Sequence, residues 1–472
     1  MSFLDKASTV ARPGYSKWLI PPAALCVHLS IGQVYAFSVF KTSLVERFDS
    51  SQTAVAWIFS IAIVMLGLSA AVLGTWVERS GPRKSMAVAA LCWGSGFLIG
   101  ALGIAIGSLP VLYLGYGVIG GIGLGIGYIS PVSTLIKWFP DRPGLATGMA
   151  IMGFGGGALI ASPLSNKLMS IFDSGFDPEG SGVASTTALT STFVTLGVVY
   201  LVFMLVGASL VRVPPGHGDE STAVQHPGRN GALVRASQGI RTPQFLFLWI
   251  VLFCNVTAGI GILEQAAPMI QDFFRVGDES SVSASEAAGF VGMLSLANMA
   301  GRIVWSSLSD RIGRKPIYML YLGGGLALYG LLALVGSQSV AIFVVLAMGI
   351  LSFYGGGFAT VPAYLKDLFG TLEVGAIHGR LLTAWAAAGV VGPLIVNGFL
   401  DAAGEPGSLV AADYYPALLT MVGLLAVGFV SNLMIRPVAE THFDDEAVKA
   451  SDSRASKDSD QQPVSTSKGG NR

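Results

Sequence analysis

The chain has 472 residues, of which 52% are apolar and only 12% are charged, and its mean hydropathy is +0.64. Soluble domains carry about 25% charged residues, so this composition excludes an ordinary water-soluble protein. Its 28 basic and 28 acidic residues cancel, which gives no reason to expect a nucleic-acid partner. Cys26, Cys92 and Cys254 lie within apolar stretches, and three cysteines cannot form a closed disulfide framework. The composition therefore indicates a polytopic membrane protein.

Twelve apolar stretches are long enough to cross about 30 Å of hydrocarbon as helices rising 1.5 Å per residue. They form two sets of six, which predicts an all-α membrane protein with 12 transmembrane helices. The first stretch is too long for the core of a cleavable signal peptide, so we expect it to be retained. The expected spans are 18–40, 53–77, 86–106, 111–136, 143–167, 189–211, 244–269, 287–308, 317–335, 340–365, 380–400 and 416–435.

Polar segments set the expected domain limits. A linker at 212–243 separates an N-terminal unit, 1–211, from a C-terminal unit, 244–436, and the Ser-, Asp- and Lys-rich residues 437–472 are predicted to be a disordered tail. The even number of spans puts both termini on one side. Twenty-three of the 28 lysines and arginines fall on that side and four on the other, which predicts cytoplasmic termini. We expect a monomer in a bacterial inner (plasma) membrane.

The loops after spans two and eight repeat one pattern: an acid, an arginine, a turn glycine and a basic pair. Such spacing can hold a carboxylate near a helix end against arginines, and the glycine permits a tight turn. A single copy would be an ordinary basic loop, but two copies at equivalent positions indicate an internal repeat. The loop residues are Gly74, Glu78, Arg79, Gly81 and Arg83 in the first copy and Asp310, Arg311, Gly313 and Arg314 in the second.

These paired loops resemble the signature of the major facilitator superfamily. The resemblance implies two six-helix bundles around a central cavity, with a substrate site near the membrane midplane. The segments 32–40, 128–131 and 137–140, with 255–259 in span seven, resemble the oxalate–formate antiporter and monocarboxylate porter branch. That branch implies transport of small organic anions.

Arg302 is the only lysine or arginine in the interior of any expected span, since Arg380 is the first residue of its span. An arginine at a helix centre costs about 2.5–3.5 kcal/mol on insertion scales, so it should face a wet cavity or a partner. Its planar donor fork matches a carboxylate, although pairing with a buried acid or reaching to the cytoplasm are alternatives. Asn298, one turn earlier, is expected to orient Arg302 or bind substrate, and the Asn298-x-x-x-Arg302 spacing resembles that of the monocarboxylate porters. An asparagine can also simply join membrane helices.

The resemblance implies further residues around the carboxylate. Aromatic residues on span ten line the cavity in the resembling porters, although aromatic stripes more often serve packing. Polar side chains from the N-terminal half face them. These candidates are Tyr354 and Phe358 on span ten, and Gln33, Tyr35 and Tyr128 on the N-terminal half.

Carriers of oxalate place a lysine on span eleven, where this chain has Trp385. One fixed positive charge suits one carboxylate, because a second would enter the bilayer largely uncompensated at a cost of several kcal/mol. We therefore expect a monocarboxylate substrate. His28 is a candidate for proton coupling, although a neutral, hydrogen-bonded histidine is an equal alternative. Glu264 is a second candidate, or a partner of Arg302, or an interfacial acid.

The predicted function is secondary active transport of a small organic monocarboxylate of the lactate, pyruvate, formate or glyoxylate type. Transport would be by alternating access, as symport or antiport, with the lipid bilayer and protons as further partners. The alternatives are an oxalate–formate antiporter and a transporter-like receptor that binds a metabolite without moving it. The sequence contains no nucleophile–base pair, metal cluster or phosphate loop, so we expect neither an enzyme nor a cofactor.

Overall fold

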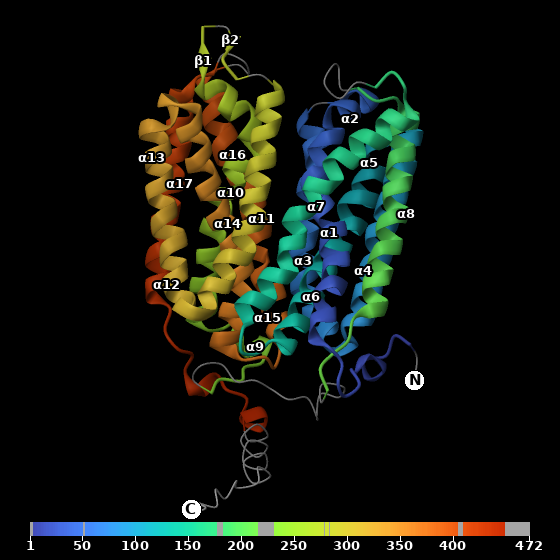
Figure 1. Cartoon of the computed structure of the whole chain (residues 1–472), viewed down its shortest axis with the longest axis vertical. Helices are drawn as coiled ribbons and strands as arrows, with labels where there is room; N and C mark the ends of the chain where they lie inside the picture. The colour runs from blue at the N-terminus through green and yellow to red at the C-terminus, as the bar shows by residue number, and fades with distance from the viewer. Residues whose placement is uncertain are drawn as a thin grey trace, which may run out of the picture.

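The computed structural model describes residues 3–50, 52–176, 183–215, 231–277, 279–282, 284–404 and 409–448. Two helical bundles stand side by side, α1 to α8 and α10 to α17 (Figure 1). A short antiparallel hairpin, β1 (Arg275–Val276) with β2 (Glu279–Ser280), marks one end of the molecule, called here the hairpin end. The predicted all-helical architecture is confirmed.

Each of the six spans expected in the N-terminal half corresponds to one helix or one run of joined helical segments. The first and fourth are composite, because 3-10 and π segments interrupt them. The elements are η1 (Lys6–Thr9), η2 (Lys17–Leu19), α1 (Ile20–Ile31), η3 (Gly32–Phe40), α2 (Lys41–Phe48), α3 (Gln52–Ser80), α4 (Pro82–Ile106), α5 (Leu109–Leu112), η4 (Tyr113–Gly120), α6 (Gly121–Trp138), α7 (Pro143–Phe172) and α8 (Thr186–Leu210).

The C-terminal half repeats this plan. Its elements are α9 (Ala236–Gly239), α10 (Pro243–Phe273), α11 (Ala284–Ile312), α12 (Arg314–Met319), η5 (Leu320–Gly324), α13 (Gly325–Val335), η6 (Gly336–Gln338), α14 (Val340–Phe369), α15 (Val374–Leu381), α16 (Thr383–Ala403), η7 (Ala411–Tyr414), α17 (Tyr415–Met434) and η8 (Glu440–His442).

Among the described residues, eleven helical segments are long and apolar enough to cross a membrane. The twelfth expected span is α11, which has the length but carries Asn298 and Arg302 in its middle. Polar residues that lower the hydropathy of one helix in an otherwise apolar bundle are typical of a functional position.

The eleventh span begins earlier than predicted. The sequence suggested residue 380, whereas α15 starts at Val374 and is followed by α16 after Leu382. The polar residues His378 and Arg380 made this first part look like a loop, so His378 lies in the span rather than before it, and Arg380 lies within the span rather than at its start. Arg302 is therefore not the only arginine in a membrane span.

The glycines of the two repeated loops form the tight turns predicted for them. Gly81 (φ 81°) precedes α4 and Gly313 (φ 93°) precedes α12, both in the left-handed region that favours glycine. Both loops, η1 and α9 lie at the end opposite the hairpin, which is called here the motif end (Figure 1).

Residues 437–448, predicted as the start of a disordered tail, pack against the linker at the motif end. The Asp444 backbone N–H donates to the Leu233 carbonyl at 2.8 Å, and the Asp444 carboxylate forms an ion pair with Arg235. The low hydropathy of this segment gave no sign of these contacts, because they are made by hydrogen bonds and an ion pair and not by apolar packing. Linker residues 216–230 and tail residues 449–472 lie outside the described residues.

The two bundles meet along two seams. On one, α7 packs against α11 and α14, and on the other α3 packs against α15 and α16. Small residues permit the close approach: a Cβ on Gly74 would lie 2.9 Å from the Cα of Ala376 in the other half. The side chains between these seams form the centre of the molecule.

Candidate functional site

Arg302 lies at the centre, on α11, with 1% of its surface exposed. Its Nε donates to Asn298 Oδ1 at 3.1 Å, and one terminal nitrogen donates to the Ile151 carbonyl of α7, also at 3.1 Å. The other terminal nitrogen is buried and has no hydrogen-bond partner. In the part of the chain that the structure describes, Arg302 forms no ion pair with an acid. The guanidinium is thus oriented, and no acid that the structure describes compensates its charge.

Asn298 is fixed as firmly as the arginine it contacts. It is 3% exposed, and a Cβ on Gly355 of α14 would overlap its backbone carbonyl oxygen. Only glycine at position 355 therefore allows α14 to approach this closely. The close α11–α14 packing holds Asn298, and Asn298 holds the Arg302 fork.

Six aromatic rings pack against one another beside the guanidinium, two of them in contact with it, and are called here the aromatic cage. Arg302 Cζ lies 5.8 Å from the ring centre of Phe154 and 5.6 Å from that of Phe358, close enough for cation–π attraction. Three of the rings come from each half of the chain. They are Tyr35 (η3), Tyr128 (α6) and Phe154 (α7), and Tyr354 (α14), Phe358 (α14) and Trp385 (α16).

Trp385 packs against four of the other five rings of the cage. Its ring centre lies 4.6 Å from that of Phe358, 5.4 Å from those of Tyr128 and Phe154, and 6.4 Å from that of Tyr35. The indole is 1% exposed, and its Nε1 has no hydrogen-bond partner. Trp385 thus joins both halves while leaving a donor free.

The cage is closed across the two halves. The hydroxyls of Tyr35 and Tyr354 lie 3.3 Å apart, so a hydrogen bond joins η3 to α14. The Arg302–Ile151 hydrogen bond joins α11 to α7 in the same way. Both contacts must break for the halves to separate around the site.

Buried polar atoms without partners gather here. Leaving such an atom unpaired costs about 1–3 kcal/mol, so a cluster of them is suited to binding a polar ligand. In the cage they are the free nitrogen of Arg302, the hydroxyl of Tyr128 and the Nε1 of Trp385. One cation with neutral donors, in apolar surroundings, is suited to binding an anion.

Two predicted candidates are not among the contacts of the cage that the structure describes. Gln33 is buried, but its Oε1 accepts a hydrogen bond from Tyr116 at 3.0 Å, and Tyr116 packs among the aromatic residues of the N-terminal bundle. Its contacts therefore point away from the cage. The side chain of Glu264 lies outside the described residues.

Two histidines flank Tyr128. His28 Nε2 lies 3.2 Å from the Tyr128 carbonyl oxygen, and its ring centre is 5.5 Å from that of Tyr128. His378, from the other half, is 5.8 Å from the same ring. Both are buried, and each keeps one ring nitrogen without a partner.

Phe154 and His378 were missed by the sequence analysis. Phe154 lies within the glycine-rich segment 153–157, which favours helix packing, and His378 lies before the predicted start of its span. An accurate start for α15 would have placed His378 in the membrane, where a histidine is a functional candidate by default.

The repeated loops hold the two halves together at the motif end through two acidic contacts, called here the Asp310 clamp and the Glu78 clamp. Asp310 accepts hydrogen bonds from the backbone N–H groups of Gly144 and Leu145, both at 2.8 Å, at the start of α7 in the other half. It also pairs with Arg314 at 2.7 Å. A carboxylate at a helix N-terminus is favoured by both hydrogen bonding and the helix dipole.

The first loop does the same in the reverse direction. Glu78 accepts from the backbone N–H of Gly375, at the start of α15, at 3.1 Å. Its cationic partner is Lys137, at 2.6 Å, and not the loop arginine. Arg83 instead donates to the carbonyl of Phe3 at 2.7 Å, so the expected acid–arginine pair is absent from this copy. Arg79 and Arg311 are exposed.

The family model of the Major Facilitator Superfamily matches residues 23–393, and again 282–456. The chain therefore belongs to this superfamily of transporters, and the resemblance seen in the sequence is confirmed. The match to a solved structure agrees: a transporter of the superfamily, FucP, in its outward conformation, superposes with a TM-score of 0.64 at 16% identity, over 90% of this chain and 100% of that one.

Three curated relatives refine the branch. An uncharacterized MFS-type transporter of Escherichia coli, YhjX, is 27% identical over 77% of this chain and 83% of its own length. The oxalate:formate antiporter of Oxalobacter formigenes is 25% identical over 88% and 91%. Monocarboxylate transporter 2 of Meriones unguiculatus is 24% identical over 86% and 82%. The chain is thus a distant homologue of the oxalate–formate antiporters and monocarboxylate transporters, and it is a transporter rather than an enzyme.

Proposed function

We propose that the protein is a secondary active transporter of a small organic monocarboxylate, of the lactate, pyruvate, formate or glyoxylate type. The observation that carries this proposal is the buried guanidinium of Arg302, which is held by Asn298 and has one free nitrogen and no ion pair with any acid that the structure describes. A carboxylate would accept from that nitrogen and neutralise the charge. The names of two relatives, an oxalate:formate antiporter and a monocarboxylate transporter, are consistent with such a substrate.

The cage favours one carboxylate over two. Its remaining free donors, the Tyr128 hydroxyl and the Trp385 indole N–H, are neutral. They can hydrogen-bond a keto, hydroxyl or aldehyde oxygen at the far end of the substrate, whereas a second carboxylate would keep an uncompensated charge in the membrane.

Alternating access follows from the contacts that join the halves. Substrate enters when the cage contacts open, and release requires the Asp310 and Glu78 clamps to open at the other end. In our proposal the termini are cytoplasmic and the membrane is a bacterial inner membrane. The closed motif end is then the cytoplasmic gate.

Proton coupling is a further part of the proposal. His28 has a free Nδ1 and lies against Tyr128, so a proton there would be close to the bound anion. Glu264, near the hairpin end of α10, is the other candidate. Simultaneous recording of internal pH and substrate uptake distinguishes symport from exchange.

Two rival functions make different predictions. An oxalate–formate antiporter would exchange labelled oxalate against external formate in proteoliposomes, which a monocarboxylate carrier would not. A receptor would be stabilised by its ligand on heating and yet carry no flux.

The decisive test is Arg302→Lys, which keeps the charge but removes the planar fork. We expect uptake of labelled substrate in proteoliposomes to fall at least tenfold, with normal expression and thermal stability. Arg47→Lys is the matched control, because the bonds of Arg47 that the structure describes go to backbone carbonyls near the hairpin end, those of Ile104 and Ala105. Unchanged uptake in the Arg302 variant would refute the mechanism.

A further inference from the structure

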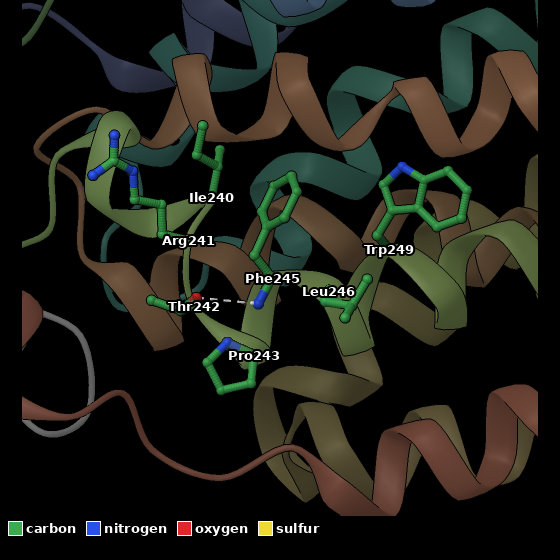
Figure 2. Close-up of a pocket in the computed structure, with 7 residues that line it drawn as sticks. All are labelled: Ile240, Arg241, Thr242, Pro243, Phe245, Leu246 and Trp249. Carbon is green, nitrogen blue, oxygen red and sulfur yellow. Dashed lines mark hydrogen bonds between the residues drawn. The ribbon is translucent and has the colours of Figure 1, made fainter.

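A groove on the outer surface of the C-terminal half lies far from the aromatic cage in the sequence and has a different chemistry. It runs along the end of α9 and the first turns of α10, and its volume is about 650 Å³. Figure 2 shows the side chains arranged as a strip, with Arg241 at one end and Trp249 at the other. The lining residues are Ile240, Arg241, Thr242, Pro243, Phe245, Leu246 and Trp249.

The groove has one charged residue, Arg241, and six uncharged ones. Arg241 is exposed, and within the described residues it forms no ion pair. Leu246 is 56% exposed and Ile240 is 39% exposed, so the apolar part of the groove opens outward. A free cation beside an exposed apolar surface matches a ligand with an anionic head and a hydrocarbon tail.

The floor of the groove is rigid. Trp249 stacks on Phe253 with ring centres 5.4 Å apart and planes 7° apart, and its Nε1 donates to Thr383 Oγ1 at 2.9 Å. At the other end the Thr242 hydroxyl caps α10 by accepting from the Phe245 N–H at 3.2 Å (Figure 2). A surface already held in place loses little entropy when a ligand binds.

The position of the groove fits the membrane interface. The 31 residues of α10 rise about 46 Å, which exceeds the roughly 30 Å of hydrocarbon, so its ends reach the headgroup region. Arg241 lies just before α10, and Trp249 lies about 9 Å along the helix from its first residue, Pro243. This places Trp249 near the membrane–water interface, where tryptophan is enriched. Charge and apolar surface are thus ordered along the membrane normal as they are in a phospholipid.

From these observations we infer that the groove binds an anionic phospholipid. Arg241 pairs with the phosphate, and the acyl chain lies along Leu246 and Trp249. Trp249 is tied to Thr383 on α16, which packs on α3 of the other half, so the bound lipid lies beside one of the seams between the bundles. This inference rests on the membrane location and is independent of the transported substrate.

The test uses the full-length protein in detergent, with native mass spectrometry of bound phosphatidylglycerol and phosphatidylcholine. We expect phosphatidylglycerol to bind more tightly, and Arg241→Gln to weaken its binding about fivefold, the effect of one arginine near an anionic surface. Arg241→Lys should retain binding. Arg12→Gln is the matched control, because Arg12 is exposed in the other half.

A photoactivatable phosphatidylglycerol locates the lipid directly, and its crosslinks should fall on the peptide covering residues 240–249. Equal affinity for the two lipids, no effect of Arg241→Gln, or crosslinks confined to other peptides would each overturn the inference. A failure of substrate transport would leave it unaffected, because neither measurement involves transport.

Discussion

The Asp310 clamp makes the sharpest prediction about how the carrier opens. Asp310→Asn keeps the size of the side chain but removes its negative charge. The carboxylate accepts two hydrogen bonds from the start of α7, from the backbone N–H groups of Gly144 and Leu145. Those bonds exist only while the motif end is closed. The substitution should therefore shift the equilibrium toward the state in which the motif end is open.

The magnitude follows from the two lost charge-assisted hydrogen bonds. Each is worth about 1.5–3 kcal/mol, but water replaces it in the open state, and asparagine can still accept one bond. The net loss is about 2 kcal/mol, which is roughly a thirtyfold change in the ratio of closed to open molecules. The carboxylate is only 9% exposed, so solvent screening reduces this value little.

Ser133 provides a reporter beneath the same gate. It is 5% exposed and lies against Gly375 of the other half, so a cysteine there should react slowly while the motif end is closed. In a background with the three native cysteines replaced, Ser133→Cys should be alkylated at least ten times faster when Asp310→Asn is added. Asp141→Asn, which removes an exposed acid at the same end, is the control.

An alkylation rate within twofold of the parent, in a protein that still binds substrate, would contradict this reasoning. It would mean that apolar packing along the seams, and not the Asp310 carboxylate, holds the motif end closed. Acceleration by the control variant to the same extent would point to general loosening of the fold.

Three further predictions follow from single contacts. Gly301→Ala places a Cβ against a carbonyl of α14 and should cost about 1–3 kcal/mol, seen as a lower melting temperature, whereas Gly330→Ala has open space and should not. Trp385→Lys adds a second cation to the cage and should raise oxalate counterflow at least tenfold relative to formate, with Trp385→Gln as the uncharged control. Burial alone would raise the pKa of Asp444, but hydrogen bonds from a backbone N–H and Arg235 lower it overall. The tail contact should therefore persist at neutral pH and weaken below about pH 4, and Asp444→Asn should speed trypsin cleavage after Arg235.

The sequence was sufficient where a local rule applied. Helical spacing alone put Asn298 and Arg302 on one face, and they are hydrogen-bonded in the structure. The sequence was insufficient where a side chain takes its hydrogen-bond or ion-pair partner from a distant segment of the chain. Nothing near Gln33 in the sequence predicts Tyr116, and nothing near Glu78 indicates that Lys137, and not an arginine, will reach it.

The uneven balance of charge between the centre and the motif end bears on how the carrier cycles. Each clamp acid at the motif end has a cation, whereas Arg302 is buried and has no acidic partner among the side chains that the structure describes. In the proposed mechanism the groups that replace water around the empty guanidinium, namely Asn298, the Ile151 carbonyl and two aromatic rings, carry no charge, so burying the cation in the closed, empty carrier would cost free energy. A carboxylate on Arg302 removes that penalty and leaves the cage neutral. In that mechanism the loaded protein would pass through the closed state more readily than the empty one, so we expect exchange of one anion for another to be faster than net movement. A proton taken up at His28 together with the anion would restore the positive charge of the cage, so symport must move that proton to a group outside it.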